Sequence, residues 1–179
     1  MRIIKDVDPI WRTDDYDVVL VGTNVYALLS NGFQSKIRFK YPRVSKANDS
    51  TPYGDMRKIG TNLRVDGTPT ICLMYILGYP DTVRECLNYE GLERCLRLAE
   101  AEFRGMRLMT TVPGSTAFDG NGNKERIVKL MGDIFSETDI DVYDYIQIPR
   151  AEESKMVIRR LDEEGITGKG NILKQLYLD

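Results

Sequence analysis

One stretch of the sequence has the composition of an anion-binding loop. Residues 113–123 read PGSTAFDGNGN and separate an apparent strand from an apparent helix. Backbone N–H groups in a loop of small residues are unpaired donors that converge on an anion, and the start of the following helix adds partial positive charge. We therefore interpret it as a phosphate-binding loop with five candidate ligand contacts, Gly114, Ser115, Thr116, Ala117 and Phe118. The alternative is a surface loop tightened by glycine, in which Asn123 or Asp119 caps the helix.

A second loop of similar character follows another apparent strand, in residues 21–35, which read VGTNVYALLSNGFQS. Asn24 comes directly after the strand, where a carboxamide can bond ribose hydroxyls; the alternative is an asparagine that stabilises a turn. Four further ligand contacts are expected here, mainly through backbone N–H groups: Gly32, Phe33, Gln34 and Ser35. Ligands of parallel α/β sheets bind outside the carboxyl ends of the strands, so two such loops at one edge would hold a diphosphate between them.

The composition narrows the chemistry that these loops can support. The chain has 179 residues, a net charge of −2, three cysteines and no histidine. Without imidazole, catalysis depends on carboxylates, lysine, arginine, cysteine, backbone amides or water, and we expect neither a metal nor a cofactor. The near-neutral charge argues against nucleic acid as a partner, and no run approaches the roughly 18 apolar residues of a membrane span. We expect reduced cysteines and a cytoplasmic protein.

Strands that alternate with helices are expected to position the two loops. An apolar, β-branched run at residues 16–23 predicts a strand that is buried on both faces. Further strands are expected at 2–8, 106–112, 139–148 and as a pair within 56–79; helices are expected between Gly32 and Pro42 and at 88–105, 123–137 and 150–165; residues 43–56 indicate a loop. This order predicts an α/β fold, a three-layer α/β/α sandwich with a mixed, largely parallel central sheet.

The order of these motifs resembles the macro domain, an ADP-ribose-binding module, and within it the branch of the terminal ADP-ribose glycohydrolases. The resemblance covers roughly residues 1–148. IIKDVD is similar to the family's first strand, which places Asp6 on the aspartate that contacts the adenine amino group. DVVLVGTN resembles the segment DAIVNAAN, with Asn24 on the asparagine that faces the distal ribose, and SNGFQSKIRFKYPRV resembles the first phosphate loop with its helix. IFSETDIDVYDY is the most similar single segment.

The sequence departs from the family pattern within the loops. Gln34 stands in place of the second glycine of the first loop, and residues 115–117 replace the glycine-containing core of the second. The lysine of the ester-hydrolysing branch has no counterpart, because no lysine occurs between residues 58 and 124, whereas Asp119 falls on the aspartate of that branch. The side chains of Gln34 and Lys36, larger than those of the family, could fill the phosphate pocket.

The resemblance implies a protein that binds ADP-ribose or a related nucleotide and leaves three roles open. In the first, Asp119 activates water or a ribose hydroxyl while Asn24 orients the distal ribose, and the protein hydrolyses ADP-ribosyl linkages or ADP-ribose 1″-phosphate. In the second, it is a non-catalytic reader that binds or sequesters a signalling nucleotide. In the third, it is a structural or interaction protein on a macro-like scaffold with a degenerate pocket.

The C-terminal residues 149–179 lie outside the resemblance to a macro-like domain of residues 1–148. The segment ESKMVIRRLDEEG carries apolar and charged residues at helical spacing. We expect residues 149–179 to form a helical extension that packs either on the domain or on a protein partner.

Overall fold

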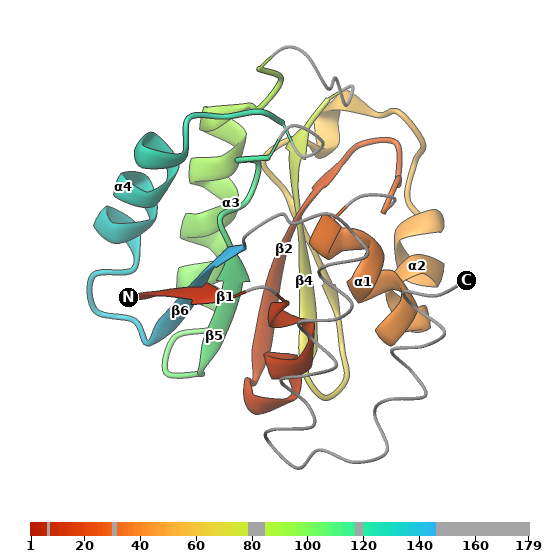
Figure 1. Ribbon diagram of the computed structural model, residues 1–179. Coiled ribbons are helices and arrows are strands. Elements are labelled where there is room, and N and C mark those ends of the chain that lie inside the picture. The colour runs from red at the N-terminus through yellow and green to blue at the C-terminus, as the bar shows by residue number, and fades with distance from the viewer. Residues whose placement is uncertain (7, 30–31, 79–84, 117–119, 146–179) are drawn as a thin grey trace.

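A computed structural model describes residues 1–6, 8–29, 32–78, 85–116 and 120–145 (Figure 1). The described strands form one six-stranded sheet in the order β1-β6-β5-β2-β4-β3, in which only the pair of β3 with β4 is antiparallel. The strands are β1 Arg2–Asp6, β2 Val18–Asn24, β3 Asn62–Val65, β4 Thr70–Leu77, β5 Leu108–Thr111 and β6 Ile140–Tyr145. The helices are α1 Gly32–Lys40, α2 Pro42–Asp49, α3 Tyr89–Glu102 and α4 Lys124–Ile134, with short 3-10 helices η1 Pro9–Asp15 and η2 Met56–Lys58.

Helices cover both faces of this sheet. Helices α3 and α4 lie on one face, and α1 and α2 lie on the other (Figure 1). Two apolar clusters fill the spaces between the layers, one around Leu20, Met74 and Leu96, the other around Val21 and Leu73. Every residue of β2 is buried, as expected for a strand that is covered on both faces. The predicted three-layer α/β/α sandwich with a mixed sheet is confirmed.

Helices α3 and α4 begin where the sequence predicts and end three residues earlier than predicted, at Glu102 and Ile134. The side chain of Asn88 accepts a hydrogen bond from the backbone N–H of Gly91 and caps α3. Asn123 accepts a hydrogen bond of 2.9 Å from the N–H of Arg126 and caps α4 in the same way. Such caps satisfy N–H groups that have no partner inside the helix. The C-cap of α3 is Phe103, so the predicted C-cap Gly105 lies two residues further on, in a turn where its φ is +82°.

The prediction of a loop at residues 43–56 is wrong in its first half, because α2 occupies Pro42–Asp49. As predicted, α1 ends before Pro42, at Lys40. Pro42 also begins α2 at its first position, where proline lacks only an N–H that would have no partner anyway. The buried side chains of α2 are those of Val44 and Asn48, so the segment has little apolar periodicity. The 3-10 helix η1 was also not predicted.

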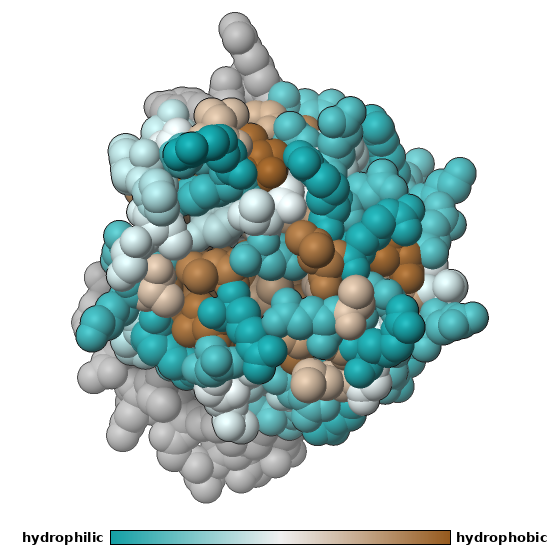
Figure 2. Space-filling view, turned by 180° about the vertical axis from the view of Figure 1, so that it is seen from behind, coloured by the Kyte–Doolittle hydropathy of each residue, from teal (hydrophilic) through white to brown (hydrophobic). Residues whose placement is uncertain are grey.

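The face of the described part that lies behind the view of Figure 1 is largely hydrophilic. Seen from behind, apolar groups appear as separate patches among hydrophilic ones (Figure 2). No helix in the described ranges is long and apolar enough to span a bilayer. Cys72, Cys86 and Cys95 are all free thiols, as the sequence predicts. The predicted helix at 150–165 and the extension 149–179 lie outside the described residues.

Candidate functional site

The sheet brings the two predicted loops to one rim. Strands β2 and β5 are parallel neighbours, with Val18 in register with Leu108, so the segments that follow them leave the sheet side by side. A Cβ atom on Gly22 of β2 would lie 3.2 Å from Cβ of Pro113, which follows β5. We call residues 24–35 loop one and residues 112–123 loop two. The prediction that both loops lie at the carboxyl edge of the parallel strands is confirmed.

Loop two is a closed turn held by its own backbone. The N–H of Gly122 donates to the carbonyl of Gly114 at 2.8 Å, and the N–H of Asn121 donates to the carbonyl of Thr116 at 2.9 Å. The hydroxyl of Ser115 donates back to the carbonyl of Val112 at 2.8 Å. These bonds bring the two ends of the loop together. The remaining predicted residues of this loop, Ala117, Phe118 and Asp119, lie outside the described residues.

Two glycines of loop two are required by packing. Gly120 has a φ of +110°, and a Cβ atom on it would lie 2.7 Å from Cδ2 of Leu77. A Cβ atom on Gly122 would lie 2.5 Å from Cδ2 of Leu87 and 3.0 Å from the carbonyl oxygen of Gly114. The glycine-tightened loop with a capping asparagine, which the sequence left as the alternative, therefore accounts for the composition of the second half of loop two. The first half, residues 113–116, keeps the interpretation as a phosphate loop.

Loop two is also tied to the segment that precedes α3. The carbonyl of Gly120 accepts hydrogen bonds from the N–H groups of Cys86 and Leu87, at 2.8 and 3.2 Å. The hydroxyl of Tyr89 accepts a bond of 2.8 Å from the N–H of Asn123 and donates to the carboxylate of Glu85. Tyr89 thus positions the end of loop two. Sequence reasoning missed this role, because a tyrosine at the start of a helix carries no signal of a contact 34 residues away.

Asn24 is bonded within loop one. Its side-chain oxygen accepts hydrogen bonds from the N–H groups of Tyr26 and Leu28, at 3.0 and 3.2 Å. Its side-chain nitrogen donates to the carbonyl of Leu28 at 2.8 Å, and the residue is only 3% exposed. Asn24 therefore fixes the course of residues 24–28, which matches the turn-forming alternative for this residue. A contact between Asn24 and a ribose stays a prediction.

The first turn of α1 presents an open backbone. Gly32 is exposed with a φ of +50°, and a Cβ atom placed on it would meet no atom within 4 Å. Phe33 and Gln34 are buried, so their side chains turn toward the protein interior, and Phe33 packs with Ile37 in the core. The hydroxyl of Ser35 donates to the carbonyl of Gly32 at 3.1 Å. Because the first N–H groups of a helix have no partner inside the helix, this turn has backbone donors that can bind an anion.

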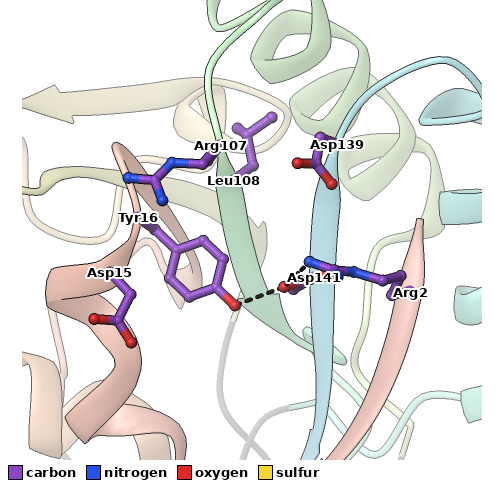
Figure 3. A pocket seen from close by; sticks show the side chains of 7 residues that line it. All are labelled: Arg2, Asp15, Tyr16, Arg107, Leu108, Asp139 and Asp141. Carbon is purple, nitrogen blue, oxygen red and sulfur yellow. Dashed lines mark hydrogen bonds and ion pairs between the residues drawn. The ribbon is translucent and has the colours of Figure 1, made fainter.

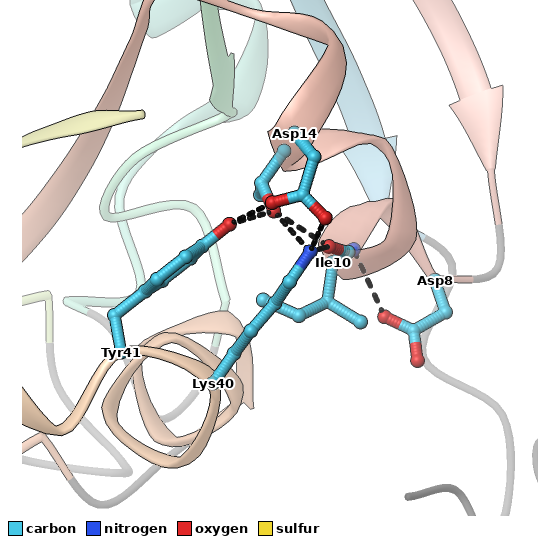
Figure 4. A network of polar contacts seen from close by, with 6 residues as sticks. Asp8, Ile10, Asp14, Lys40 and Tyr41 are labelled. Atoms are coloured by element: carbon cyan, nitrogen blue, oxygen red, sulfur yellow. Dashed lines mark hydrogen bonds and ion pairs between the residues drawn. The ribbon is translucent and has the colours of Figure 1, made fainter. Parts of the chain in front are cut away.

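A network of polar contacts anchors α1 to η1 (Figure 4). The amine of Lys40 donates to the carbonyl of Ile10 at 3.0 Å and to a carboxylate oxygen of Asp14 at 2.8 Å. The hydroxyl of Tyr41 donates to the other oxygen of Asp14 at 2.7 Å, and burial raises the pKa of Tyr41. One turn earlier, Lys36 lies 3.1 Å from the buried carboxylate of Asp8. The amine of Lys36 therefore pairs with a carboxylate of the η1 segment.

Two residues complete this rim. Asp6, the predicted adenine contact, ends β1 in register with Tyr145 of β6. Thr23 lies directly before Asn24, and its side-chain oxygen is buried without a hydrogen-bond partner in the described part of the chain. A buried hydroxyl without a partner is costly. The sequence gives no signal for Thr23, which reads as one more β-branched residue of a buried strand.

A separate pocket of about 140 Å³ lies at the opposite rim, where β5 and β6 begin (Figure 3). Its floor holds Asp141, which accepts two hydrogen bonds from the guanidinium of Arg2, at 2.7 and 2.8 Å, and one of 2.6 Å from the hydroxyl of Tyr16. Burial and the bond to Asp141 raise the pKa of Tyr16. The carboxylate is thus already bonded to side chains of the protein, and this pocket is remote from loop one and loop two. No group of three or more acidic or cysteine residues within the described ranges is arranged to hold a metal ion.

No family model matches the sequence, and no curated protein matches it. Solved structures do match the fold. DarTG of Thermosipho africanus, in complex with ADP-ribose, has a TM-score of 0.64 and 13% identity over 86% of this chain and 44% of that chain. The macrodomain of Thermus aquaticus DarG has a TM-score of 0.55 and 14% identity over 82% and 97% of the two chains. A Trypanosoma brucei macrodomain, also in complex with ADP-ribose, has a TM-score of 0.56 and 16% identity over 86% and 66%.

Proposed function

Because the chain has the macrodomain fold, we propose that it binds ADP-ribose or a related nucleotide at the rim from which loop one and loop two leave the sheet. The observation that carries the proposal is the parallel pairing of β2 with β5, which sets the two loops next to each other. Ligands of open α/β sheets bind at this edge. The solved structures of the same fold that contain ADP-ribose support the choice of ligand.

In this proposal the diphosphate is bound by backbone donors. The first N–H groups of α1, from Gly32 to Ser35, are oriented along the helix axis, and the helix start carries partial positive charge. Residues 114–116 of loop two would approach the diphosphate from the neighbouring strand exit. This arrangement needs no positive net charge, in keeping with the chain's net charge of −2. The exposed position of Gly32 leaves the start of the helix open to a phosphate.

A calorimetric titration of ADP-ribose into the protein tests the proposal. The informative variant is Gly32→Glu, because nothing fills the space around Gly32 and a carboxylate there would repel the diphosphate. Gly32→Gln is the matched control, with the same backbone strain and nearly the same shape but no charge. We expect the glutamate variant to bind at least about tenfold more weakly than the glutamine variant, a difference of about 1.4 kcal/mol. Absence of binding by the unmodified protein at millimolar ADP-ribose would overturn the proposal.

We further propose that hydrolysis of an ADP-ribosyl ester or of ADP-ribose 1″-phosphate, if the protein catalyses it, depends on Asp119. A carboxylate is the general base that a chain without histidine has available. Asn24 would act by holding loop one in place through its bonds to Tyr26 and Leu28. Asp119→Asn should abolish the release of ADP-ribose from an ester-modified substrate while ADP-ribose binding persists. Hydrolysis at the original rate in this variant would remove Asp119 from the mechanism.

A non-catalytic reader is the second candidate function, and one observation favours it. The carboxamide of Asn24 makes three hydrogen bonds to its own loop and is almost fully buried, so it is committed to a structural task. The absence of a lysine between residues 58 and 124 points the same way. A reader would bind ADP-ribose and leave ester-modified substrates intact over hours. Release of ADP-ribose by the unmodified protein, lost in Asp119→Asn, would exclude this role.

A further inference from the structure

Three apolar side chains are exposed at the rim that carries loop one. Tyr53 is 73% exposed, Met56 is 56% exposed and Leu28 is 43% exposed. Tyr26 packs against Tyr53, with 5.2 Å between the two ring centroids in an edge-to-face arrangement. We call these four residues the rim platform. Exposed aromatic and apolar groups that gather at one place are typical of binding surfaces.

The backbone around the rim platform is held in place by hydrogen bonds and close packing. The N–H of Gly54 donates to the carbonyl of Val25 at 3.0 Å, which joins the segment of Tyr53 to loop one. Gly54 has a φ of +68°, and a Cβ atom on it would lie 3.1 Å from the ring of Tyr26. Asn24 bonds the backbone of both Tyr26 and Leu28. The backbone that carries these side chains is thus already ordered before a partner binds, which lowers the entropic cost of binding.

The sheet fixes where the rim platform lies relative to the proposed nucleotide site. Strand β2 lies between β5 and β4, so loop one lies between loop two and the end of β4. The N–H of Val25 donates to the carbonyl of Leu77, the last residue of β4, at 3.1 Å. A Cβ atom on Gly78 would lie 3.0 Å from the terminal carbon of Met56. Tyr53 and Met56 of the rim platform therefore border loop one on the side of β4, away from loop two, and Tyr26 and Leu28 belong to loop one itself.

The chemistry of the rim platform favours a polypeptide partner over a nucleic acid. Within the described residues of the adjoining segment, the guanidinium of Arg57 is exposed but its charge is neutralised by Asp55 at 2.7 Å. The amine of Lys58 is buried and donates to Thr51 at 2.9 Å. Lys58 also lies 4.5 Å from the centre of the Tyr75 ring. A nucleic-acid surface combines aromatic groups with cations for the phosphates. Tyrosine and methionine without such cations are typical of protein interfaces.

We propose that the rim platform docks an apolar side chain of the polypeptide to which the ADP-ribosyl group is attached. This inference rests on the proposed function, because the nucleotide at loop one brings its carrier to the platform. In the proposed function the diphosphate lies between loop one and loop two, and Tyr53 and Met56 lie on the other side of loop one, toward the end of β4. It contacts residues next to the modified one and selects carriers by their flanking side chains. Methionine and tyrosine adapt to different apolar partners at low entropic cost.

Two synthetic peptides test the inference, each with one ADP-ribosyl group, flanked by leucines in the first and by serines in the second. We expect the unmodified protein to bind the leucine peptide about tenfold or more tightly than the serine peptide, as burial of an apolar side chain predicts. The double variant Tyr53→Ser, Met56→Ser should lose this preference and keep its affinity for free ADP-ribose. The matched control is Leu98→Ser, Met106→Ser, which removes two exposed apolar groups elsewhere and should keep the preference.

The outcomes separate this inference from the proposed function. If the unmodified protein binds the two peptides equally and still binds free ADP-ribose, the proposed role of the rim platform is wrong and the proposed function stands. Absence of binding to free ADP-ribose would overturn both. An ADP-ribosylated oligonucleotide that binds more tightly than either peptide, with the gain lost in the Tyr53 and Met56 double variant, would overturn the assignment to a polypeptide.

Discussion

Replacing Gly120 by alanine should destabilise the protein through two separate effects. The φ of +110° at this position is one that residues with a side chain rarely adopt, and such backbone strain costs about 1–3 kcal/mol. The added Cβ atom would also lie 2.7 Å from Cδ2 of Leu77. Leu77 is fully buried, so its side chain has little room to move, and overpacking of this kind costs about 1–3 kcal/mol more.

Gly105→Ala provides the matched control for this change. Gly105 has a φ of +82°, but a Cβ atom on it would meet nothing within 4 Å. This variant therefore carries only the backbone strain, about 1–2 kcal/mol. Urea unfolding of both variants at neutral pH gives the two free energies of unfolding, and we expect Gly120→Ala to be less stable than Gly105→Ala by about 1–3 kcal/mol.

The same pair of variants separates stability from binding. The carbonyl of Gly120 joins loop two to Cys86 and Leu87, so a displaced backbone should weaken ADP-ribose binding in Gly120→Ala. Gly105→Ala lies at the end of α3 and should bind ADP-ribose as the unmodified protein does. Equal free energies of unfolding in the two variants would refute the packing argument for loop two, whatever the binding shows.

Three further predictions concern contacts outside the loop-two glycines. Lys36→Met should lower the free energy of unfolding by about 3 kcal/mol, because it removes the amine that pairs with the buried carboxylate of Asp8. In urea unfolding, the double variant Lys36→Met, Asp8→Asn should recover most of this loss. A double variant as unstable as Lys36→Met would contradict the pairing. Because burial raises the pKa of Tyr16, the native state keeps a proton that the unfolded chain loses above about pH 10. The free energy of unfolding should therefore fall as the pH rises above that value. Unfolding measurements at a series of alkaline pH values should show a shallower fall in Tyr16→Phe. Tyr89→Phe should weaken ADP-ribose binding by releasing the N–H of Asn123, and an unchanged calorimetric titration would show that loop two is held without it.

The layers of the fold were predictable from local patterns. The β-branched apolar residues at the start of VVLVGTN predicted a strand covered on both faces, and β2 is buried at every residue. Helices α3 and α4 carry apolar residues at helical spacing and have asparagine caps that the sequence displays. Helix α2 was missed because the surrounding helices and strands, rather than its own composition, stabilise it. Only Val44 and Asn48 of that helix are buried.

The position of the candidate site in the fold was predictable from the sequence, but the contacts of its individual side chains were not. Glycine-rich segments after two apolar runs predicted two loops at one rim, and the pairing of β2 with β5 places them there. The roles of single side chains depended on contacts that sequence spacing does not show. Asn24 turned out to bond its own loop, which competes with any bond to a ligand. Lys36 was considered as a side chain that could fill the phosphate pocket, and it pairs with Asp8, 28 residues earlier in the chain.

The hydrogen bonds and ion pairs between α1 and η1 fix the orientation of the helix start at which the proposed anion would bind. Lys36 and Lys40 occupy successive turns of α1, and each is bonded to a carboxylate of the η1 segment. The helix that supplies the N–H groups of loop one is therefore clamped along one side before any ligand arrives. A phosphate that binds at Gly32 meets donors whose direction is already set. Substitutions at Asp14, which lies at the far end of the clamp, should then change affinity without touching the ligand.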